Sequence, residues 1–252
     1  MASHTAQVEE RPSDEVLIPH LPEEAQALIR ECLNLFREVG DKRFIAWSLL
    51  NLGRVASHQD DFSTAQTLLE ESLSLFKELG EKRGIPYSLL NLGMMARKQG
   101  DYSVAQAYSE KSLVIFREIG DRSGIAWSLY NLGRVASDQD DTSSAQTYYE
   151  ESLTLWREIG DRNGIVWSLR AFAGLAAKES KSEQAVVLWG AAEALREDIR
   201  APLPSNEREL YDRGVAAARQ ALGDELFTTV WAKGRAMTLE EAIALALKSP
   251  VS

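Results

Sequence analysis

Residues 36–66 read FREVGDKRFIAWSLLNLGRVASHQDDFSTAQ, and this stretch decides the fold because it recurs three more times along the chain. Its counterparts are FKELGEKRGIPYSLLNLGMMARKQGDYSVAQ at 76–106, FREIGDRSGIAWSLYNLGRVASDQDDTSSAQ at 116–146 and WREIGDRNGIVWSLRAFAGLAAKESKSEQAV at 156–186. The offset is 40 residues each time, with no insertion. Repetition at such a period is typical of a stack of similar units, each of which packs mainly on its neighbours.

Each period contains two stretches with helical periodicity. The first, near 43–58, places apolar residues at steps of three or four: Ile45, Leu49, Leu52 and Ala56. A second stripe of the same kind runs through 62–79. Between the two, Asp61 supplies a carboxylate for the free amides of the second helix. Gly80 is expected to end that helix, because glycine adopts a positive φ without steric cost.

Two further features refine these helix pairs. Pro86 lacks an amide hydrogen and belongs in a first helical turn, so the first helix of that unit is expected to begin near residue 83 or later. Small residues recur where the two helices of a pair would cross: Gly53, Gly93, Gly133, Ala65, Ala105 and Ala145. A glycine inside a helix costs about 0.5–1 kcal/mol relative to alanine, so three in register indicate a close approach of the backbones.

This order of residues resembles a tetratricopeptide repeat. In the first unit it runs Leu49, Leu52, Gly53, Ala56, Ala65, Leu69 and Ser72, and the spacing recurs in the next two units. The fourth unit departs from it, since Ala171-Phe172-Ala173 replaces Asn-Leu-Gly. The period exceeds the usual one of about 34 residues, and glycine stands where the family has proline, as in the long-repeat subclass of kinesin light chains, Pins-type adaptors and bacterial regulators. The resemblance implies an all-α fold, a right-handed α-solenoid of antiparallel helix pairs with a C-terminal helical cap.

The repeat divides the chain into four parts. Residues 1–20 are expected to form a flexible tail, 21–40 a lone starting helix, 41–200 four 40-residue units and 201–252 a helical capping segment. The last part is expected to hold three helices, near 206–221, 224–233 and 239–248, the third with a capping box of Thr238 and Glu241. The sequence over 191–247 also resembles the C-terminal region of bacterial signal-transduction ATPases with LuxR-type or AfsR-type DNA-binding domains, which implies a sensor or partner-binding arm.

Composition and charge exclude several function classes. The chain has 252 residues, 44 % of them hydrophobic, with 28 Lys/Arg against 38 Asp/Glu and a net charge of −10. This acidic balance argues against direct binding to nucleic acid or to anionic membranes. With a single cysteine, no signal-peptide pattern and no long apolar run, we expect a cytoplasmic protein. No phosphate-loop, zinc or dithiol motif is present and the three histidines are scattered, so we expect no enzyme, no metal and no cofactor.

A second stripe on the first helix of each unit points away from the leucine stripe. Trp47, Asn51 and Arg54 lie at i, i+4 and i+7, and stacking would align them with their counterparts in the other units. The candidate ligand-binding residues are Trp47, Asn51, Arg54, Tyr87, Asn91, Met94, Trp127, Tyr130, Asn131, Arg134, Trp167 and Arg170. In tetratricopeptide arrays this helix lines the concave surface, so the resemblance implies a groove for an extended peptide. Packing against the preceding unit explains Trp47 and Trp167 equally well, and His58 is interpreted as solvated.

Charge divides between the two helices of each pair. The first-helix segments 42–59, 82–99, 122–139 and 162–178 contain 12 Lys/Arg and one acid, whereas the second-helix segments 61–79, 101–119 and 141–159 contain 11 acids and four bases. We therefore expect a positive inner wall and a protein or peptide ligand with acidic groups. The leading interpretation is a non-catalytic interaction module. A ligand-sensing arm of a signal-transduction ATPase or transcriptional regulator and a self-associating assembly block stay open, as do the identity of the ligand, the completeness of the chain, the oligomeric state and the role of 201–252.

Overall fold

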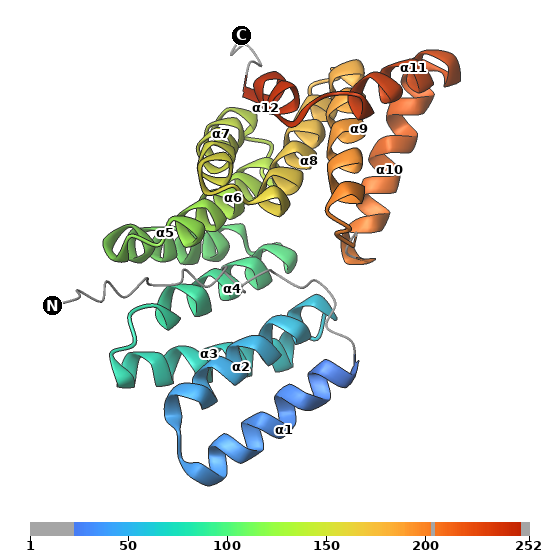
Figure 1. Cartoon of the computed structure of the whole chain (residues 1–252). Coiled ribbons are helices and arrows are strands. Elements are labelled where there is room, and N and C mark those ends of the chain that lie inside the picture. Colours follow the sequence, from blue (N-terminus) through green and yellow to red (C-terminus); the bar gives the residue numbers. More distant parts are fainter. Residues whose placement is uncertain (1–22, 203–204, 248–252) are drawn as a thin grey trace, which may run out of the picture.

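The computed structural model describes residues 23–202 and 205–247, and these form a stack of helices (Figure 1). In chain order the helices are α1 (Glu23–Val39), α2 (Lys42–His58), α3 (Phe62–Leu79), α4 (Gly84–Lys98), α5 (Tyr102–Ile119), α6 (Arg122–Asp138), α7 (Thr142–Ile159), α8 (Arg162–Lys178), α9 (Ser182–Asp198), α10 (Ser205–Leu222), α11 (Asp224–Arg235) and α12 (Leu239–Leu247). Within the described ranges no strand occurs, and the predicted right-handed solenoid of antiparallel helix pairs is confirmed. The tail predicted for 1–20 lies outside the described residues.

Helix ends follow the local signals. The side chain of Asp61 accepts a hydrogen bond from the Thr64 amide and caps α3, and equivalent aspartates cap α2, α6, α7 and α8. The second helices end at glycines in the left-handed conformation: Gly80, Gly120 and Gly160. As Pro86 predicts, α4 begins late, at Gly84, and has no side-chain cap.

Glycines hold the two helices of a pair, and successive pairs, close together. A Cβ at Gly53 would lie 2.8 Å from Cγ of Leu69, so only glycine fits at that crossing. A second glycine row was not anticipated: a Cβ at Gly124 would lie 2.2 Å from Cδ1 of Phe116, because the aromatic ring at the end of the preceding helix fills that space. Gly84 with Phe76 and Gly164 with Trp156 repeat this contact along the stack.

A ladder of buried serine hydroxyls also joins successive units. Ser112 Oγ on α5 donates to the Pro86 carbonyl of α4 at 2.9 Å and lies 3.1 Å from Ser128 Oγ of α6. The Ser72 hydroxyl makes the same contacts one unit earlier. These hydroxyls are fully buried, so the hydrogen bonds satisfy groups that water cannot reach.

Replacing Ser112 with alanine is expected to lower the free energy of unfolding by about 1–2 kcal/mol, because the buried Ser128 hydroxyl loses a partner. Urea denaturation followed by circular dichroism measures the change. Ser103→Ala, at an exposed position in the first turn of the same helix, is the control and should stay within about 0.5 kcal/mol of wild type. Equal losses in the two variants would contradict a structural role for the ladder.

Ion pairs repeat between the start of a first helix and the end of its partner. Lys42 pairs with Glu78 at 2.5 Å, and the equivalent pairs 36 residues apart are Arg122 with Glu158 and Arg162 with Asp198. Their side chains are about half exposed, so each contributes little to stability. These cations belong to the helix ends and not to the inner wall.

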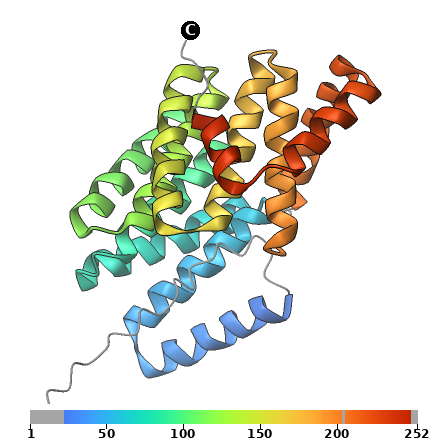
Figure 2. The same ribbon diagram turned by 45° about the horizontal axis from the view of Figure 1, so that its top comes forward.

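The segment after residue 200 packs on the end of the stack. Its helices lie within two residues of their predicted bounds, and Thr238 and Glu241 form the predicted capping box. α11 crosses α9 where Gly190 and Gly234 bring the two backbones together. Figure 2 shows α12 lying across the side of the stack, where it contacts α7, α8 and α9. We interpret the segment as the cap of the solenoid, a prediction about its role that these contacts support.

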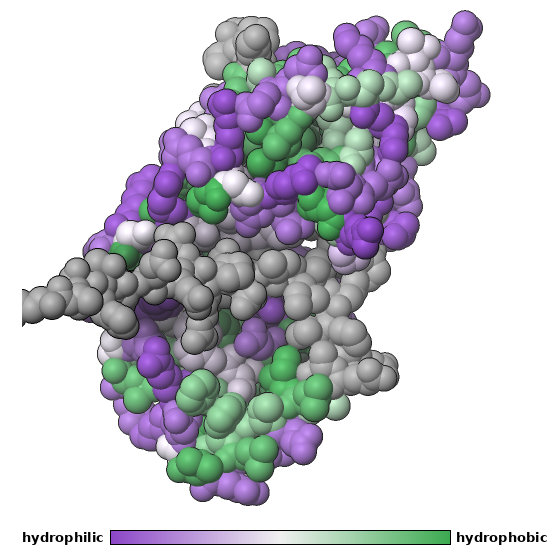
Figure 3. Space-filling model, in the orientation of Figure 1, coloured by the Kyte–Doolittle hydropathy of each residue, from purple (hydrophilic) through white to green (hydrophobic). Residues whose placement is uncertain are grey.

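The other end of the stack is apolar. Leu28, Leu35 and Val39 of α1 and Phe44 of α2 are more than half exposed. Figure 3 shows hydrophobic side chains gathered over α1 in the lower part of the molecule. α1 is the second helix of a unit by its register, and the later second helices α3, α5 and α7 pack most extensively on the first helix of their own unit.

Candidate functional site

The first helices form the inner wall of the solenoid. α2 contacts α4, α4 contacts α6 and α6 contacts α8, whereas no comparable contact joins α3 to α5 or α5 to α7. Helices on the inside of a curved stack lie closer together than those on the outside, so α2, α4, α6 and α8 lie on the concave side. The side chains that these four helices turn away from the core therefore share one surface.

The aromatic row of this wall is largely packed within the stack. The Trp47 ring lies 5.0 Å from the Phe76 ring and 6.1 Å from the Tyr87 ring, measured between centroids. Trp127 and Trp167 are 4.4 Å apart. The four aromatics of this row, Trp47, Tyr87, Trp127 and Trp167, keep partial exposure. They act first as contacts between neighbouring units, and only their exposed edges are available to a ligand.

Two side chains of the asparagine row form hydrogen bonds within their own helices. The Asn91 amide nitrogen donates to the Tyr87 carbonyl at 2.8 Å, and that of Asn131 donates to the Trp127 carbonyl at 2.9 Å. Asn131 is only 1 % exposed, and its neighbour Tyr130 is also buried. Asn51 and Asn91 keep partial exposure. The structure therefore brings two of the three asparagines to the groove surface.

A basic pocket lies between α2, α4 and α6. Four cations line it: Arg54, Arg97, Lys98 and Arg134. Asn91 and Met94 complete the wall on α4, and no carboxylate belongs to the lining. The pocket has a volume of about 40 Å³ and is mostly enclosed, so it holds about three water molecules. Sequence-predicted residues from three successive units thus meet at one place.

Arg97 is a deeply buried cation of this pocket. Its side chain is 13 % exposed, and its Nη1 donates to Asp138 Oδ2 of α6 at 2.5 Å. Burial, and then the positive charge of Arg134, hold the pKa of the Arg97 guanidinium below its usual value, and Asp138 offsets part of that effect. Two like charges therefore line the same mostly enclosed pocket, where water screens their repulsion poorly.

Two lysines at the edge of the inner wall bind the C-terminal ends of neighbouring first helices. Lys98 Nζ donates to the Ser57 carbonyl at 2.6 Å and to Asp60 Oδ1 at 3.0 Å, at the C-terminus of α2. Lys178 makes the same pair of contacts with Ser137 and Asp140 at the end of α6. A cation at a helix C-terminus is favoured by the helix dipole, so both lysines help to align neighbouring first helices.

Other predicted residues lie apart from this pocket. The Arg170 guanidinium stacks over the Tyr211 ring of α10 at 5.2 Å and so faces the C-terminal segment. Arg134 lies over the Tyr130 ring at 5.7 Å while also lining the pocket. Neither Trp47 nor Trp167 lines it. The predicted residues thus form a row along the wall. Four of them line the basic pocket: Arg54, Asn91, Met94 and Arg134.

Four lining residues were not on the predicted list. Arg97 and Lys98 have no basic counterpart in most other units, since serines stand at 57 and 137 and His58 and Asp138 at the equivalents of Lys98. His58, interpreted from the sequence as solvated, is half-buried and lines the pocket with Ser57. The excess of basic residues in the first helices includes Arg97 and Lys98, but without a shared register across the units they did not join the candidate ligand-binding residues.

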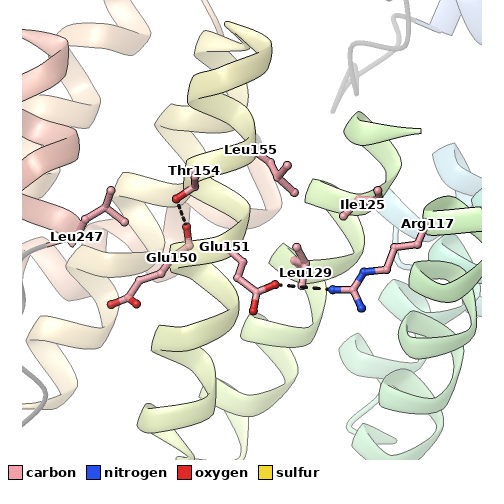
Figure 4. Close-up of a pocket in the computed structure, with 8 residues that line it drawn as sticks. All are labelled: Arg117, Ile125, Leu129, Glu150, Glu151, Thr154, Leu155 and Leu247. Atoms are coloured by element: carbon pink, nitrogen blue, oxygen red, sulfur yellow. Dashed lines mark hydrogen bonds and ion pairs between the residues drawn. The ribbon is translucent and has the colours of Figure 1, made fainter. Parts of the chain in front are cut away.

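Two further hollows lie outside the inner wall. The larger, about 520 Å³ and open, lies beside α6 and α7, where Ile125, Leu129 and Leu155 supply apolar side chains (Figure 4). Arg117 and Glu151 point toward each other there, with nitrogen and oxygen 3.7 Å apart. The second, about 190 Å³, lies under the start of α12, next to Leu169 of α8 and Ala194 of α9.

Two features are absent from the described residues. No group of three or more His, Cys, Asp or Glu side chains there could hold a metal ion. Among the helices that the structure describes, none is long and apolar enough to cross a membrane.

Comparison with known proteins agrees with the fold. Residues 20–78 and 85–158, together more than half of the chain, match the family model described as tetratricopeptide repeat. The crystal structure of BtubC (BKLC) from P. vanneervenii superposes with a TM-score of 0.64 at 16 % identity, covering 88 % of this chain and 92 % of that one. At this level of identity the likeness concerns the fold alone.

Curated relatives match over a shorter stretch. Proteins of Mycobacterium bovis and Mycobacterium tuberculosis, provisionally named as HTH-type transcriptional regulators, are 42 % identical over 74 residues, which is 29 % of this chain. Those residues make up only 8 % of the relatives' own length. The repeat pattern, the helix pairs and the family match lead to one conclusion: the chain belongs to the tetratricopeptide repeat family.

Proposed function

We propose that the chain is a non-catalytic interaction module that holds an extended partner segment with acidic groups in its concave groove. Tetratricopeptide repeats generally form non-catalytic scaffolds that bind proteins, which supports the coarser part of this proposal. The basic pocket between α2, α4 and α6 carries the finer part. Its four cations stand on the concave side with no carboxylate in the lining, while Asp138 and Asp60 beside the pocket pair with Arg97 and Lys98. Such a wall, with four cations against these two acids, attracts an anionic segment.

The surrounding wall suits an extended segment. Exposed edges of Trp47, Tyr87, Trp127 and Trp167 offer apolar area at low entropic cost. Asn51 and Asn91 keep partial exposure, and their amide oxygens can accept hydrogen bonds from a peptide backbone, an interaction that does not depend on the peptide's sequence. Tyr130 and Asn131 are buried, so we assign them to shaping the wall and not to contact with the partner.

Reversing two charges of the pocket tests this proposal. In the double variant Arg54→Glu, Arg134→Glu, binding of a fluorescent pool of Asp/Glu-rich nine-residue peptides is expected to weaken by about thirtyfold or more, because each reversed charge repels the ligand. Fluorescence anisotropy measures the affinity, and circular dichroism checks the fold. Lys111→Glu, an exposed position on the outer helix α5, makes a matched control and should leave binding unchanged. Equal affinity of the double variant and wild type would refute the proposal.

A second candidate function is a ligand-sensing arm of a signal-transduction ATPase or transcriptional regulator. The similarity to the mycobacterial proteins favours it, and the hollow of about 190 Å³ beneath α12 gives a small molecule a place between the stack and the C-terminal segment. A thermal-shift screen of metabolites tests it, because a ligand that binds only the folded state raises the melting temperature. A hit whose shift disappears in Ala194→Leu, which fills that hollow, would support this function.

A further inference from the structure

The basic pocket concentrates positive charge in a small, mostly enclosed space. Arg97 and Lys98 come from α4, Arg54 from α2 and Arg134 from α6, so the cations approach from three directions. The pocket is too small for a ring or a long side chain and accommodates a compact head group. Its walls thus restrict the ligand by size and by charge.

The Arg97 side chain brings a buried hydrogen-bond donor without a partner to this pocket. Arg97 gives one of its five N–H donors to Asp138, and its buried Nε makes no hydrogen bond within the described part of the chain. Burying an unpaired donor is unfavourable, and so is the repulsion between Arg97 and Arg134. An anion placed between these two guanidinium groups would relieve both costs.

We propose that the pocket binds a phosphoryl-type dianion, carried either by a side chain of the partner segment or by a free phosphorylated molecule. This inference rests on the proposed function, since it specifies the acidic group that the concave groove takes. A phosphoryl group bears about −1.5 to −2 charges at neutral pH and three terminal oxygens. It therefore accepts hydrogen bonds from three helices at once. A planar carboxylate has one charge and two oxygens and suits a single bidentate arginine.

The first test uses inorganic phosphate and the full chain. Wild type is expected to bind phosphate saturably with one site per chain, seen as shifts of arginine Nε–Hε signals in NMR spectra, and to bind acetate at least tenfold more weakly. Arg97→Lys keeps the positive charge beside Asp138 but loses the planar guanidinium group with its several N–H donors. This variant should bind phosphate at least fivefold more weakly and leave the circular dichroism spectrum unchanged. Arg134→Met should weaken it at least tenfold. Arg117→Met, on α5 outside the pocket and 56 % exposed, is the control.

The second test identifies the source of the phosphoryl group. Three peptides of one neutral sequence, carrying phosphoserine, aspartate or serine at the centre, are compared with free phosphate. Phosphoserine binding at least thirtyfold tighter than both the aspartate peptide and free phosphate assigns the group to a partner segment. Equal binding of free phosphate and the phosphoserine peptide assigns it to a small molecule.

Two outcomes overturn the inference and separate it from the proposed function. If aspartate and phosphoserine peptides bind equally, or if phosphate binding survives in Arg134→Met, the pocket is not a dianion site, yet binding of the acidic peptide pool still supports the groove function. If neither phosphate, nor the peptides, nor the acidic pool binds, the inference and the proposed function are both wrong.

Discussion

Replacing Gly234 with alanine is expected to separate α11 from α9 and to lower the free energy of unfolding by about 3 kcal/mol or more. The added Cβ would lie 2.1 Å from the Val187 carbonyl oxygen and 2.9 Å from its carbonyl carbon. Both obstructing atoms belong to the backbone of a helix, so they do not move aside as the end of a flexible side chain would. Gly190 meets α11 in the same way, with a Cβ position 2.6 Å from the Trp231 carbonyl oxygen.

Urea denaturation followed by tryptophan fluorescence and circular dichroism measures this effect. Because a solenoid unit contacts mainly its neighbours, Gly234→Ala should unfold in two steps, with the C-terminal segment lost first. The control is Gly174→Ala in α8, where a Cβ meets nothing within 4 Å and the change should stabilise by about 0.5–1 kcal/mol. A single transition at the wild-type midpoint in Gly234→Ala would show that the segment does not dock through this crossing.

Replacing Trp156 with alanine is expected to cost about 3–5 kcal/mol, because a large and fully buried side chain would leave a cavity. Trp156 is 1 % exposed, lies edge to face with Trp127 at 5.4 Å and fills the space over Gly164. It therefore joins α6, α7 and α8, and its loss should uncouple the third unit from the fourth.

The matched control is Trp156→Phe. Phenylalanine occupies the same register at Phe76 and Phe116, where it packs over Gly84 and Gly124. The buried Trp156 Nε1 also makes no hydrogen bond to the described residues, so removing it breaks none. Phenylalanine should therefore cost less than about 1.5 kcal/mol in the same urea experiment. Equal losses for alanine and phenylalanine would contradict the packing role assigned to this ring.

Much of the fold could be predicted from the sequence because its signals are local. Asp61 caps α3 through the amide three residues on, Gly80 adopts φ of 63° at the helix end, and α4 begins at Gly84 as Pro86 requires. Each of these effects is confined to one helical turn. The exact repetition of the pattern then predicted the stacking, because equivalent residues make the same contacts between each unit and the next.

The candidate site was predictable only where it follows the repeat. Arg54 and Arg134 were found because they share a register, and the structure places both in the basic pocket. Asn131 has the same register as Asn51 and yet is buried. Its neighbour Tyr130, which stands where Leu50 and Leu90 are found, is also buried and packs its ring against Tyr149. A shared register therefore did not determine the exposure of these asparagines.

The sequence by itself determined the helix pairs, their bounds, the small residues at their crossings and the excess of positive charge on the first helices, since each depends on neighbours within a few turns. Only the tertiary structure decided which cations meet. Arg97 lies 43 residues from Arg54 and 37 from Arg134, and Arg97 and Lys98 have no consistent counterparts in the other units. Their convergence depends on how successive units pack on one another, and glycines packed against aromatic rings are part of that contact between units.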